Sequence, residues 1–290
     1  MGLQIAHKLA DAGHQVIAYN RTYAKAEAAA KFGATPAKQR ADVSAVFDGP
    51  VVIWLMVPAE VVDEELAEWR KVLPAGSLII DGGNSDFRHS RRRAQELEAK
   101  GFSFIDVGVS GGVLGYANGF SLMAGGNEAT YKQIAPVLAD LAKPRGSYAR
   151  FGAAGAGHFV KMVHNAIEYG LMESLAEGYR LLAEGPYANI ELAEAARVWQ
   201  HGSIIESKLN ELAGEALKES PKLSGVEGYV AESGEARWAL ELGQQLKIPL
   251  PAIEAAFEVR LDSQKGQTSF ATKLLAAMRH KFGGHAINKE

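Results

Sequence analysis

Residues 50–81 have the sequence PVVIWLMVPAEVVDEELAEWRKVLPAGSLIID, in which a strand, a helix and a second strand follow one another. Residues 50–57 are almost continuously apolar, which is typical of a strand in a parallel sheet covered on both faces. Residues 60–73 have helical periodicity and end at a Pro-Ala-Gly stop, and residues 77–81 form another apolar run. The segment therefore predicts a βαβ unit with helices packed on a parallel sheet.

The same alternation extends to both sides of this segment. Further strands are predicted at residues 14–20, 102–107 and 120–124. Helices are predicted before Gly13, at residues 90–100 and from about residue 128. The first half of the chain is therefore predicted to be a doubly wound, Rossmann-like α/β domain.

The pattern changes near residue 155, where strand-like runs end and stretches rich in Ala, Leu and Glu begin. Glycines between residues 152 and 157 interrupt regular structure just before a long helix predicted from residue 158 to about residue 182. We expect two domains, an α/β domain at residues 1–155 and an all-α domain at residues 156–290.

The composition excludes several classes of protein. The chain of 290 residues has no cysteine, so it has no disulfide and no thiolate metal site, and its net charge of -3 gives no basic excess for nucleic acid. No apolar run is long enough to cross a bilayer, and the start lacks the pattern of a secretion signal. The eight histidines include no i,i+4 pair with a carboxylate beside it. We expect a cytoplasmic protein that binds neither membrane, nucleic acid nor metal.

Ligands of open α/β sheets bind beyond the carboxyl ends of the strands, and the first such end here is Asn20-Arg21-Thr22. An acidic residue at this place holds the ribose 2'-hydroxyl of NAD, whereas an arginine suits the 2'-phosphate of NADP. The tripeptide favours NADP. An ordinary turn with a solvated arginine stays open as the alternative.

Three further strand ends carry candidate ligand groups. Val57-Pro58-Ala59 has no charge and suits a flat apolar ring. In the sequence DGGNS at residues 81–85, the paired glycines permit close approach of a ligand, and Asn84 can donate and accept hydrogen bonds. At the next strand end, Ser110, Gly111 and Gly112 offer a hydroxyl and backbone N–H groups to a carboxylate or phosphate. A simple turn is the alternative at the first two of these sites.

The long helix has a polar stripe made of Lys161, His164, Asn165 and Glu168, whose spacing places them on one face. Apolar residues occupy the other sides, so we expect a largely buried helix whose polar stripe faces a cleft. A solvated face with an intrahelical ion pair is the alternative. These apolar residues are Phe159, Val160, Met162, Val163, Ile167 and Leu171.

Later in the chain, Arg237, Arg260, Arg279 and His285 are scattered through helical sequence. Arginines that converge would bind a phosphorylated substrate, but spacing alone does not show convergence, and each taken singly is a surface charge. The basic cluster at residues 88–93 is interpreted as the solvated start of a helix.

Taken together, these segments resemble the 6-phosphogluconate dehydrogenase family, in its short form with a reduced helical domain. The resemblance rests on KMVHN at residues 161–165 with IEY at 167–169, on DGGNS and VSGG, and on Phe282-Gly283 with His285. It implies oxidative decarboxylation of 6-phosphogluconate to ribulose 5-phosphate with reduction of NADP, or of NAD.

The resemblance also implies a role for each candidate residue. Lys161 is the general base and Glu168 the proton donor, and His164 and Asn165 complete the catalytic set. The sugar acid is held by Ser110, Gly111, Gly112, His164 and Asn165, the phosphate by Tyr169, Arg237 and Arg260, and Asn84 touches both substrate and cofactor. Arg279 and His285 match a tail that reaches into the partner subunit's site, which implies a homodimer or a larger assembly.

The chain departs from the family pattern most at its start, where Met1-Gly2 matches only the end of the glycine-rich loop. We expect the first strand and most of the pyrophosphate cradle to be missing, with Met1 and Gly2 still among the cofactor-binding residues. Smaller departures are Ala166 for glycine, Arg237 for lysine and Ala239 for threonine. Two alternatives stay open: another β-hydroxyacid dehydrogenase that acts on an unphosphorylated acid, and a truncated form with impaired cofactor binding.

Overall fold

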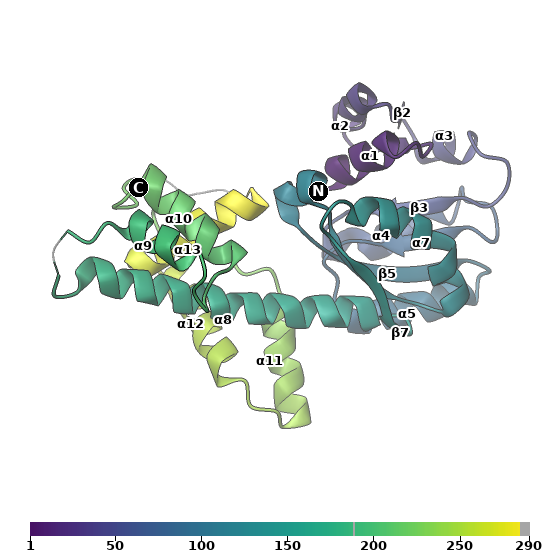
Figure 1. Ribbon diagram of the computed structural model, residues 1–290. Coiled ribbons are helices and arrows are strands. Elements are labelled where there is room, and N and C mark those ends of the chain that lie inside the picture. The colour runs from purple at the N-terminus through teal and green to yellow at the C-terminus, as the bar shows by residue number, and fades with distance from the viewer. Residues whose placement is uncertain (188, 285–290) are drawn as a thin grey trace. The chain divides into compact units, whose positions relative to one another are not determined.

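A computed structural model describes residues 1–187 and 189–284 of the chain (Figure 1). The chain divides into two compact units, Met1–Lys161 and Met162–Glu290. The division falls inside helix α8 (Ala156–Glu184), whose first residue is the one at which we expected the second domain to begin. Among the described residues, no helix is both long and apolar enough to span a membrane.

The first unit contains a five-stranded sheet in the order β3-β4-β5-β6-β7. Strands β3 (Val52–Leu55), β4 (Leu78–Asp81) and β5 (Ser103–Ser110) are parallel, which confirms the predicted βαβ arrangement. Strand β6 (Ser121–Gly125) is antiparallel to β5, and β7 (Tyr148–Gly152), which was not predicted, is parallel to β6. Strand β6 runs antiparallel to β5 because residues 111–120 are too few for a crossover connection, and the sheet is otherwise parallel, as predicted for a doubly wound domain.

Two short strands form a separate parallel sheet, β1 (Ile17–Tyr19) with β2 (Thr35–Ala37). The sequence did not predict β2, a strand of three residues with a central proline. No hydrogen-bonded pairing links β1 to β3 in the described residues. In the order 3-2-1-4-5-6 of a doubly wound sheet, this is the arrangement expected when the first strand is missing.

Helices cover both faces of the five-stranded sheet, because alternate residues of the buried strand β4 contact different clusters. Ile79 belongs to a cluster with residues of α4 (Val62–Trp69) and α5 (Phe87–Glu98). Ile80 belongs to a cluster with residues of α1 (Gly2–Asp11) and α7 (Glu128–Ala142). The remaining short helices of this unit are α2 (Tyr23–Glu27), η1 (Ala28–Phe32), α3 (Arg40–Ser44), η2 (Ala59–Val61), η3 (Gly112–Leu114) and α6 (Gly115–Asn118).

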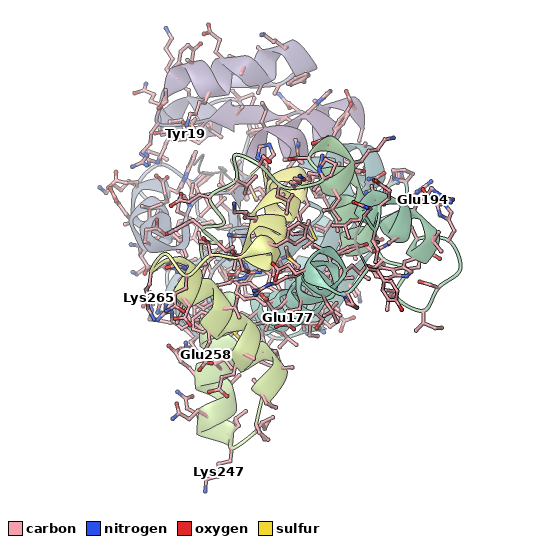
Figure 2. The ribbon with its side chains drawn as sticks, turned by 90° about the vertical axis from the view of Figure 1, so that its left-hand side faces the viewer. Tyr19, Glu177, Glu194, Lys247, Glu258 and Lys265 are labelled. Carbon is pink, nitrogen blue, oxygen red and sulfur yellow. The ribbon has the colours of Figure 1, made fainter. Side chains whose placement is uncertain are left out.

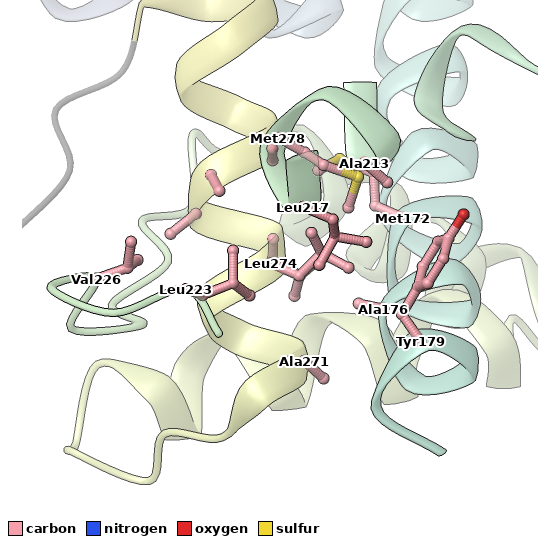
Figure 3. Packing of buried hydrophobic residues seen from close by; sticks show 14 of the residues in the cluster. Met172, Ala176, Tyr179, Ala213, Leu217, Leu223, Val226, Ala271, Leu274 and Met278 are labelled. Carbon is pink, nitrogen blue, oxygen red and sulfur yellow. The ribbon is translucent and has the colours of Figure 1, made fainter. Parts of the chain in front are cut away.

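In the second unit, every regular element of the described residues is a helix, as predicted. Besides the later part of α8, these are α9 (Leu192–Trp199), α10 (Lys208–Glu219), α11 (Glu235–Leu246), α12 (Pro251–Ser263) and α13 (Phe270–Gly283). The core lies where α8, α10 and α13 meet, around the fully buried Met172, Leu217 and Leu274 (Figure 3). Helices α11 and α12 form a hairpin with Lys247 at its tip (Figure 2).

Candidate active site

The start of α8 lies against the sheet at positions where only glycine fits. A Cβ atom on Gly108 of β5 would lie 2.4 Å from Cβ of Lys161, and one on Gly125 of β6 would lie 2.4 Å from the backbone N of Gly157. Neither distance is compatible with a side chain, so these glycines permit the close approach of helix and strand. Lys161 is thereby fixed beside the strand that ends at Ser110.

Asp106, which is fully buried on β5, binds the backbone at the start of α8. Its carboxylate accepts hydrogen bonds from the backbone N–H of Gly155 at 2.5 Å and from that of His158 at 2.8 Å. Burial raises the pKa of this carboxyl group. The sequence analysis missed Asp106, although a lone aspartate inside the apolar run FSFIDV is a recognisable signal of a buried hydrogen-bonded carboxylate.

The turn after β5 has the conformation that its sequence predicts. Gly111 and Gly112 have φ angles of 133° and 52°, which disfavour any residue with a side chain. Ser110 at the end of the strand is partly buried, whereas Gly111 is exposed. Binding of a carboxylate by this turn stays a prediction.

Among the predicted cofactor residues, Asn20, Arg21 and Thr22 form an exposed turn at the end of β1. The side-chain carbonyl of Asn20 accepts a hydrogen bond from the backbone N–H of Thr22 at 2.9 Å, which closes an Asx turn around Arg21. Met1 caps α1 and Gly2 is its first residue, and the first turn of this helix carries no acidic side chain. These features suit an anionic dinucleotide, because a helix N-terminus attracts phosphate and no carboxylate here repels it.

The ends of β3 and β4 lie in contact, which brings the region of Val57 and that of Asn84 to the same edge of the sheet. A Cβ atom on Gly83 would lie 2.8 Å from the backbone oxygen of Val57, and one on Gly82 would lie 2.1 Å from Nε1 of Trp54. The paired glycines therefore leave room for neighbouring protein atoms. The sequence predicted instead that they leave room for a ligand. Pro58 is exposed, and Val57, Ala59 and Asn84 are partly buried.

A buried arginine fixes the loop that carries Asn84. Arg93 of α5 is 2% exposed, and its guanidinium donates hydrogen bonds to Asp81 at 3.2 Å and to Asp63 at 2.7 Å. Asp81 also accepts hydrogen bonds from the backbone N–H of Gly83 and from the hydroxyl of Ser85. The interpretation of residues 88–93 as wholly solvated was wrong for Arg93, since helical spacing turns this residue toward the sheet.

The polar stripe of α8 is partly buried and hydrogen bonded rather than solvated. Nδ1 of His164 lies 2.9 Å from Oδ1 of Asn165 and 3.9 Å from Oε2 of Glu168. The side-chain amide of Asn165 donates a short hydrogen bond to Glu235, which is 2% exposed at the start of α11. Glu235 was not singled out from the sequence, because its partner lies 70 residues away along the chain.

The expectation that α8 is largely buried was wrong for one apolar stripe. Val163, Ile167 and Leu171 follow one another at i,i+4 spacing, and their exposed fractions are 37%, 51% and 55%. The core of the second unit instead receives the face that carries Tyr169, Met172 and Ala176. One side of α8 therefore presents apolar side chains that this chain does not cover.

Two of the predicted arginines converge in the second unit. Arg260 of α12 is 2% exposed, and its guanidinium carbon lies 3.2 Å from the centre of the Tyr169 ring. Burial lowers its pKa to about 10, and the positive charge of Arg279 acts in the same direction. Arg279 is 7% exposed, and burial lowers its pKa as well. Among the residues that the structure describes, neither guanidinium is in an ion pair with a carboxylate. Such a pair of buried cations suits an anion.

The other predicted phosphate residues lie differently. The Tyr169 hydroxyl accepts a hydrogen bond from the backbone N–H of Ser233 at 3.3 Å. Arg237 is half exposed and forms an ion pair with Glu232, with 2.6 Å between Nη2 and Oε1. Arg279 lies on α13, a helix that also packs into the core of this unit, and its contact with a partner subunit stays a prediction. His285 lies outside the described residues.

No group of three His, Asp or Glu side chains comes together as a metal site in the part of the chain that the structure describes.

Comparison with known proteins gives a consistent result for both units. The model of the NAD binding domain of 6-phosphogluconate dehydrogenase matches residues 1–155, and that of the 6-phosphogluconate dehydrogenase C-terminal domain matches residues 157–268. An NAD(+)-dependent, decarboxylating 6-phosphogluconate dehydrogenase of Haloferax volcanii is 36% identical over 292 residues, covering 100% of this chain and 96% of that protein. A decarboxylating 6-phosphogluconate dehydrogenase of Candida albicans is 37% identical over 95% of this chain and 56% of its own length.

Solved structures agree with these matches. The Plasmodium falciparum 6-phosphogluconate dehydrogenase, described as apo, with NADP+ and with 6-phosphogluconate, superposes with a TM-score of 0.82 at 28% identity over 91% of this chain and 60% of that chain. A Mycobacterium tuberculosis 3-hydroxyisobutyrate dehydrogenase superposes with a TM-score of 0.73 at 22% identity, over 95% of this chain and 94% of that chain, a likeness that shows the fold alone.

Proposed function

Because the chain belongs to the 6-phosphogluconate dehydrogenase family, we propose that it oxidises and decarboxylates 6-phosphogluconate to ribulose 5-phosphate and CO2, with hydride transfer to a nicotinamide cofactor. The observation that carries the choice of substrate is the pair of buried guanidinium groups of Arg260 and Arg279. A buried cation without an ion-pair partner is costly, and a phosphate dianion would pair with both at once.

In the proposed reaction, Lys161 acts first as a base. It takes the proton of the 3-hydroxyl group while C3 loses a hydride, for which the bound nicotinamide supplies the acceptor. Protonated Lys161 then donates a hydrogen bond to the new 3-keto oxygen, so that CO2 can leave as negative charge develops there. Transfer of that proton from Lys161 to the oxygen gives an enediol. Glu168 then donates a proton to C1 while Lys161 takes the hydroxyl proton back, which leaves the ketone.

The remaining polar residues position the substrate. His164 and Asn165 follow Lys161 on the same face of α8, and the hydrogen bond from Asn165 to the buried Glu235 fixes the orientation of that amide. Ser110, Gly111, Gly112 and Asn84 are proposed to hold the sugar acid. Tyr169 stacks on Arg260 and so restricts the plane of the guanidinium that binds the phosphate.

We propose NADP as the preferred cofactor. The Asx turn formed by Asn20 and Thr22 presents Arg21 where a dinucleotide fold receives the adenosine ribose. A guanidinium group can form a charge-assisted, bidentate pair with the 2'-phosphate of NADP, whereas the 2'-hydroxyl of NAD carries no charge to pair with. The Haloferax relative is NAD(+)-dependent, so the preference of this chain has to be measured with both cofactors.

We also propose that the protein is a homodimer. Val163, Ile167 and Leu171 expose a continuous apolar stripe on α8, which a second copy would bury. Sedimentation at micromolar concentration tests this, with a dimer as the expected species and a monomer as the contrary result.

Substrate comparison separates the proposal from a related dehydrogenase for an unphosphorylated acid. Turnover of 6-phosphogluconate and of gluconate is measured with NADP and with NAD. Strong preference for the phosphorylated acid supports the proposal, and equal rates reject it. A parallel titration of NADPH fluorescence separates an active enzyme from a form with impaired cofactor binding.

A further inference from the structure

A cavity of about 470 Å³ lies between α8 and α12 in the second unit. Its walls are mostly apolar, with Ile167 and Leu171 on α8 and Ile253 and Val259 on α12. Glu173, Ser174 and Glu177 are the polar side chains that line it. The catalytic steps above use neither of these two carboxyl groups.

Glu173 is unusual for an acidic residue because it is only 7% exposed. Its carboxyl group lines the cavity and, within the described part of the chain, forms neither a hydrogen bond nor an ion pair. Burial raises its pKa to about 7, and the negative charge of Glu177 on the same helix adds to the effect. Figure 2 labels Glu177 on α8.

The positive charge of Arg260 on α12 opposes the rise in the pKa of Glu173. The α12 residues that line the cavity carry no charge. Glu173 and Tyr169 are separated by one helical turn, and the Tyr169 ring stacks on Arg260 at 3.2 Å. Besides Glu173, the charges of Arg279 and Glu168 also act on the guanidinium of Arg260.

Glu173 and a bound phosphate therefore act on the same guanidinium with charges of the same sign. Ionised Glu173 partly neutralises Arg260 and repels a dianion, whereas neutral Glu173 leaves the full positive charge of Arg260 to the dianion.

We propose that Glu173 is a positioning residue that sets the affinity of the Arg260–Arg279 pair for the phosphate group of the substrate, and that phosphate binding is accompanied by uptake of a proton from solvent onto the Glu173 carboxylate. The inference rests on the proposed function, since it assumes that these arginines bind phosphate. Below pH 7 Glu173 is neutral and affinity is highest. Affinity falls as Glu173 ionises above pH 7, by roughly five- to tenfold, the low end of couplings between interacting sites.

The test uses inorganic sulfate, a dianion that does not itself titrate between pH 6 and 8. Calorimetric titration of the full chain at pH 7.5, in two buffers of different ionisation enthalpy, measures proton uptake on binding. The wild type is expected to take up a fraction of a proton and to bind sulfate five- to tenfold more weakly at pH 8 than at pH 6. Glu173→Gln is expected to take up none and to bind at both pH values as the wild type does at pH 6.

Two further variants serve as controls. Glu177→Gln removes the like charge, so the pH dependence of sulfate binding is expected to move to lower pH. Glu184→Gln removes a carboxylate of α8 that is 53% exposed and paired with Arg180, and is expected to leave the pH dependence unchanged. Thermal unfolding of each variant confirms that it is folded.

The outcomes separate this inference from the proposed function. One outcome is that Arg260→Met loses sulfate binding while the wild type binds sulfate without proton uptake and without pH dependence. This outcome overturns the role of Glu173 and keeps the phosphate site. Absence of binding by both sulfate and 6-phosphogluconate overturns the proposed phosphate site, and the role of Glu173 with it.

Discussion

Replacement of Arg260 by methionine separates the contribution of this residue to substrate binding from its contribution to stability. The guanidinium is 2% exposed, and the structure shows it stacked on Tyr169, with Nη2 3.8 Å from the sulfur of Met172. A hydrogen bond to a charged group contributes about 1.5–3 kcal/mol, so loss of a bidentate pair with phosphate costs about 3 kcal/mol at the lower end. This corresponds to a loss of roughly 10²-fold in kcat/KM for 6-phosphogluconate.

The same substitution is expected to leave the fold intact. Methionine replaces the aliphatic part of the arginine side chain with an unbranched, adaptable one, and it removes a buried charge that is in no ion pair among the described residues. The midpoint of thermal unfolding should therefore be unchanged or higher.

The assay compares kcat/KM for 6-phosphogluconate and for gluconate, together with thermal unfolding, in the wild type, Arg260→Met and Arg180→Met. Arg180 is a matched control because it is 48% exposed and forms a surface ion pair with Glu184 on α8. The reasoning is refuted if Arg260→Met loses stability while its relative activity on the two acids stays the same, since Arg260 would then be structural.

Three further predictions follow the same logic. Lys161→Met is expected to lower kcat by roughly 10²- to 10⁴-fold with little change in cofactor binding, as steady-state kinetics will show, and an unchanged kcat removes Lys161 from the mechanism. Arg21→Asp is expected to shift the ratio of kcat/KM from NADP toward NAD, and a constant ratio contradicts the assignment of this turn. Gly108→Ala places a methyl group 2.4 Å from Cβ of Lys161 and is expected to lower the free energy of unfolding, measured in urea, by about 1–3 kcal/mol. Gly178→Ala is the control, because its methyl group meets open space on α8, and it should raise the free energy of unfolding by about 1 kcal/mol. Equal effects of the two substitutions would contradict the close packing of α8 on β5.

The sequence predicted the elements whose residues carry a strong periodic signal. The apolar runs of β3 and β4 and the long helix α8 are confirmed, as is the change to an all-helical second half. Strands β2 and β7 were missed because β2 contains a proline and β7 exposes Arg150 and Phe151, so neither shows a buried strand pattern.

The sequence did not predict contacts between residues that are far apart along the chain. The polar stripe of α8 could be placed from helical spacing, but its partner Glu235 comes from a distant helix. The convergence of Arg260 and Arg279, and the burial of Arg93 beside Asp81, depend on how helices pack, which spacing along the chain does not encode. For the same reason helical periodicity predicts burial of the apolar stripe with Ile167 and Leu171, whereas the structure leaves these side chains about half exposed.

The central claim is tested most directly by measuring product formation from 6-phosphogluconate. The purified full chain is incubated with 6-phosphogluconate or gluconate, and reduction of NADP or NAD is followed at the same time as release of CO2. We expect one CO2 for each cofactor reduced, and kcat/KM at least 10²-fold higher for the phosphorylated acid than for gluconate, from the contribution of a bidentate phosphate contact. Equal activity on the two acids, or cofactor reduction without release of CO2, would contradict the assignment.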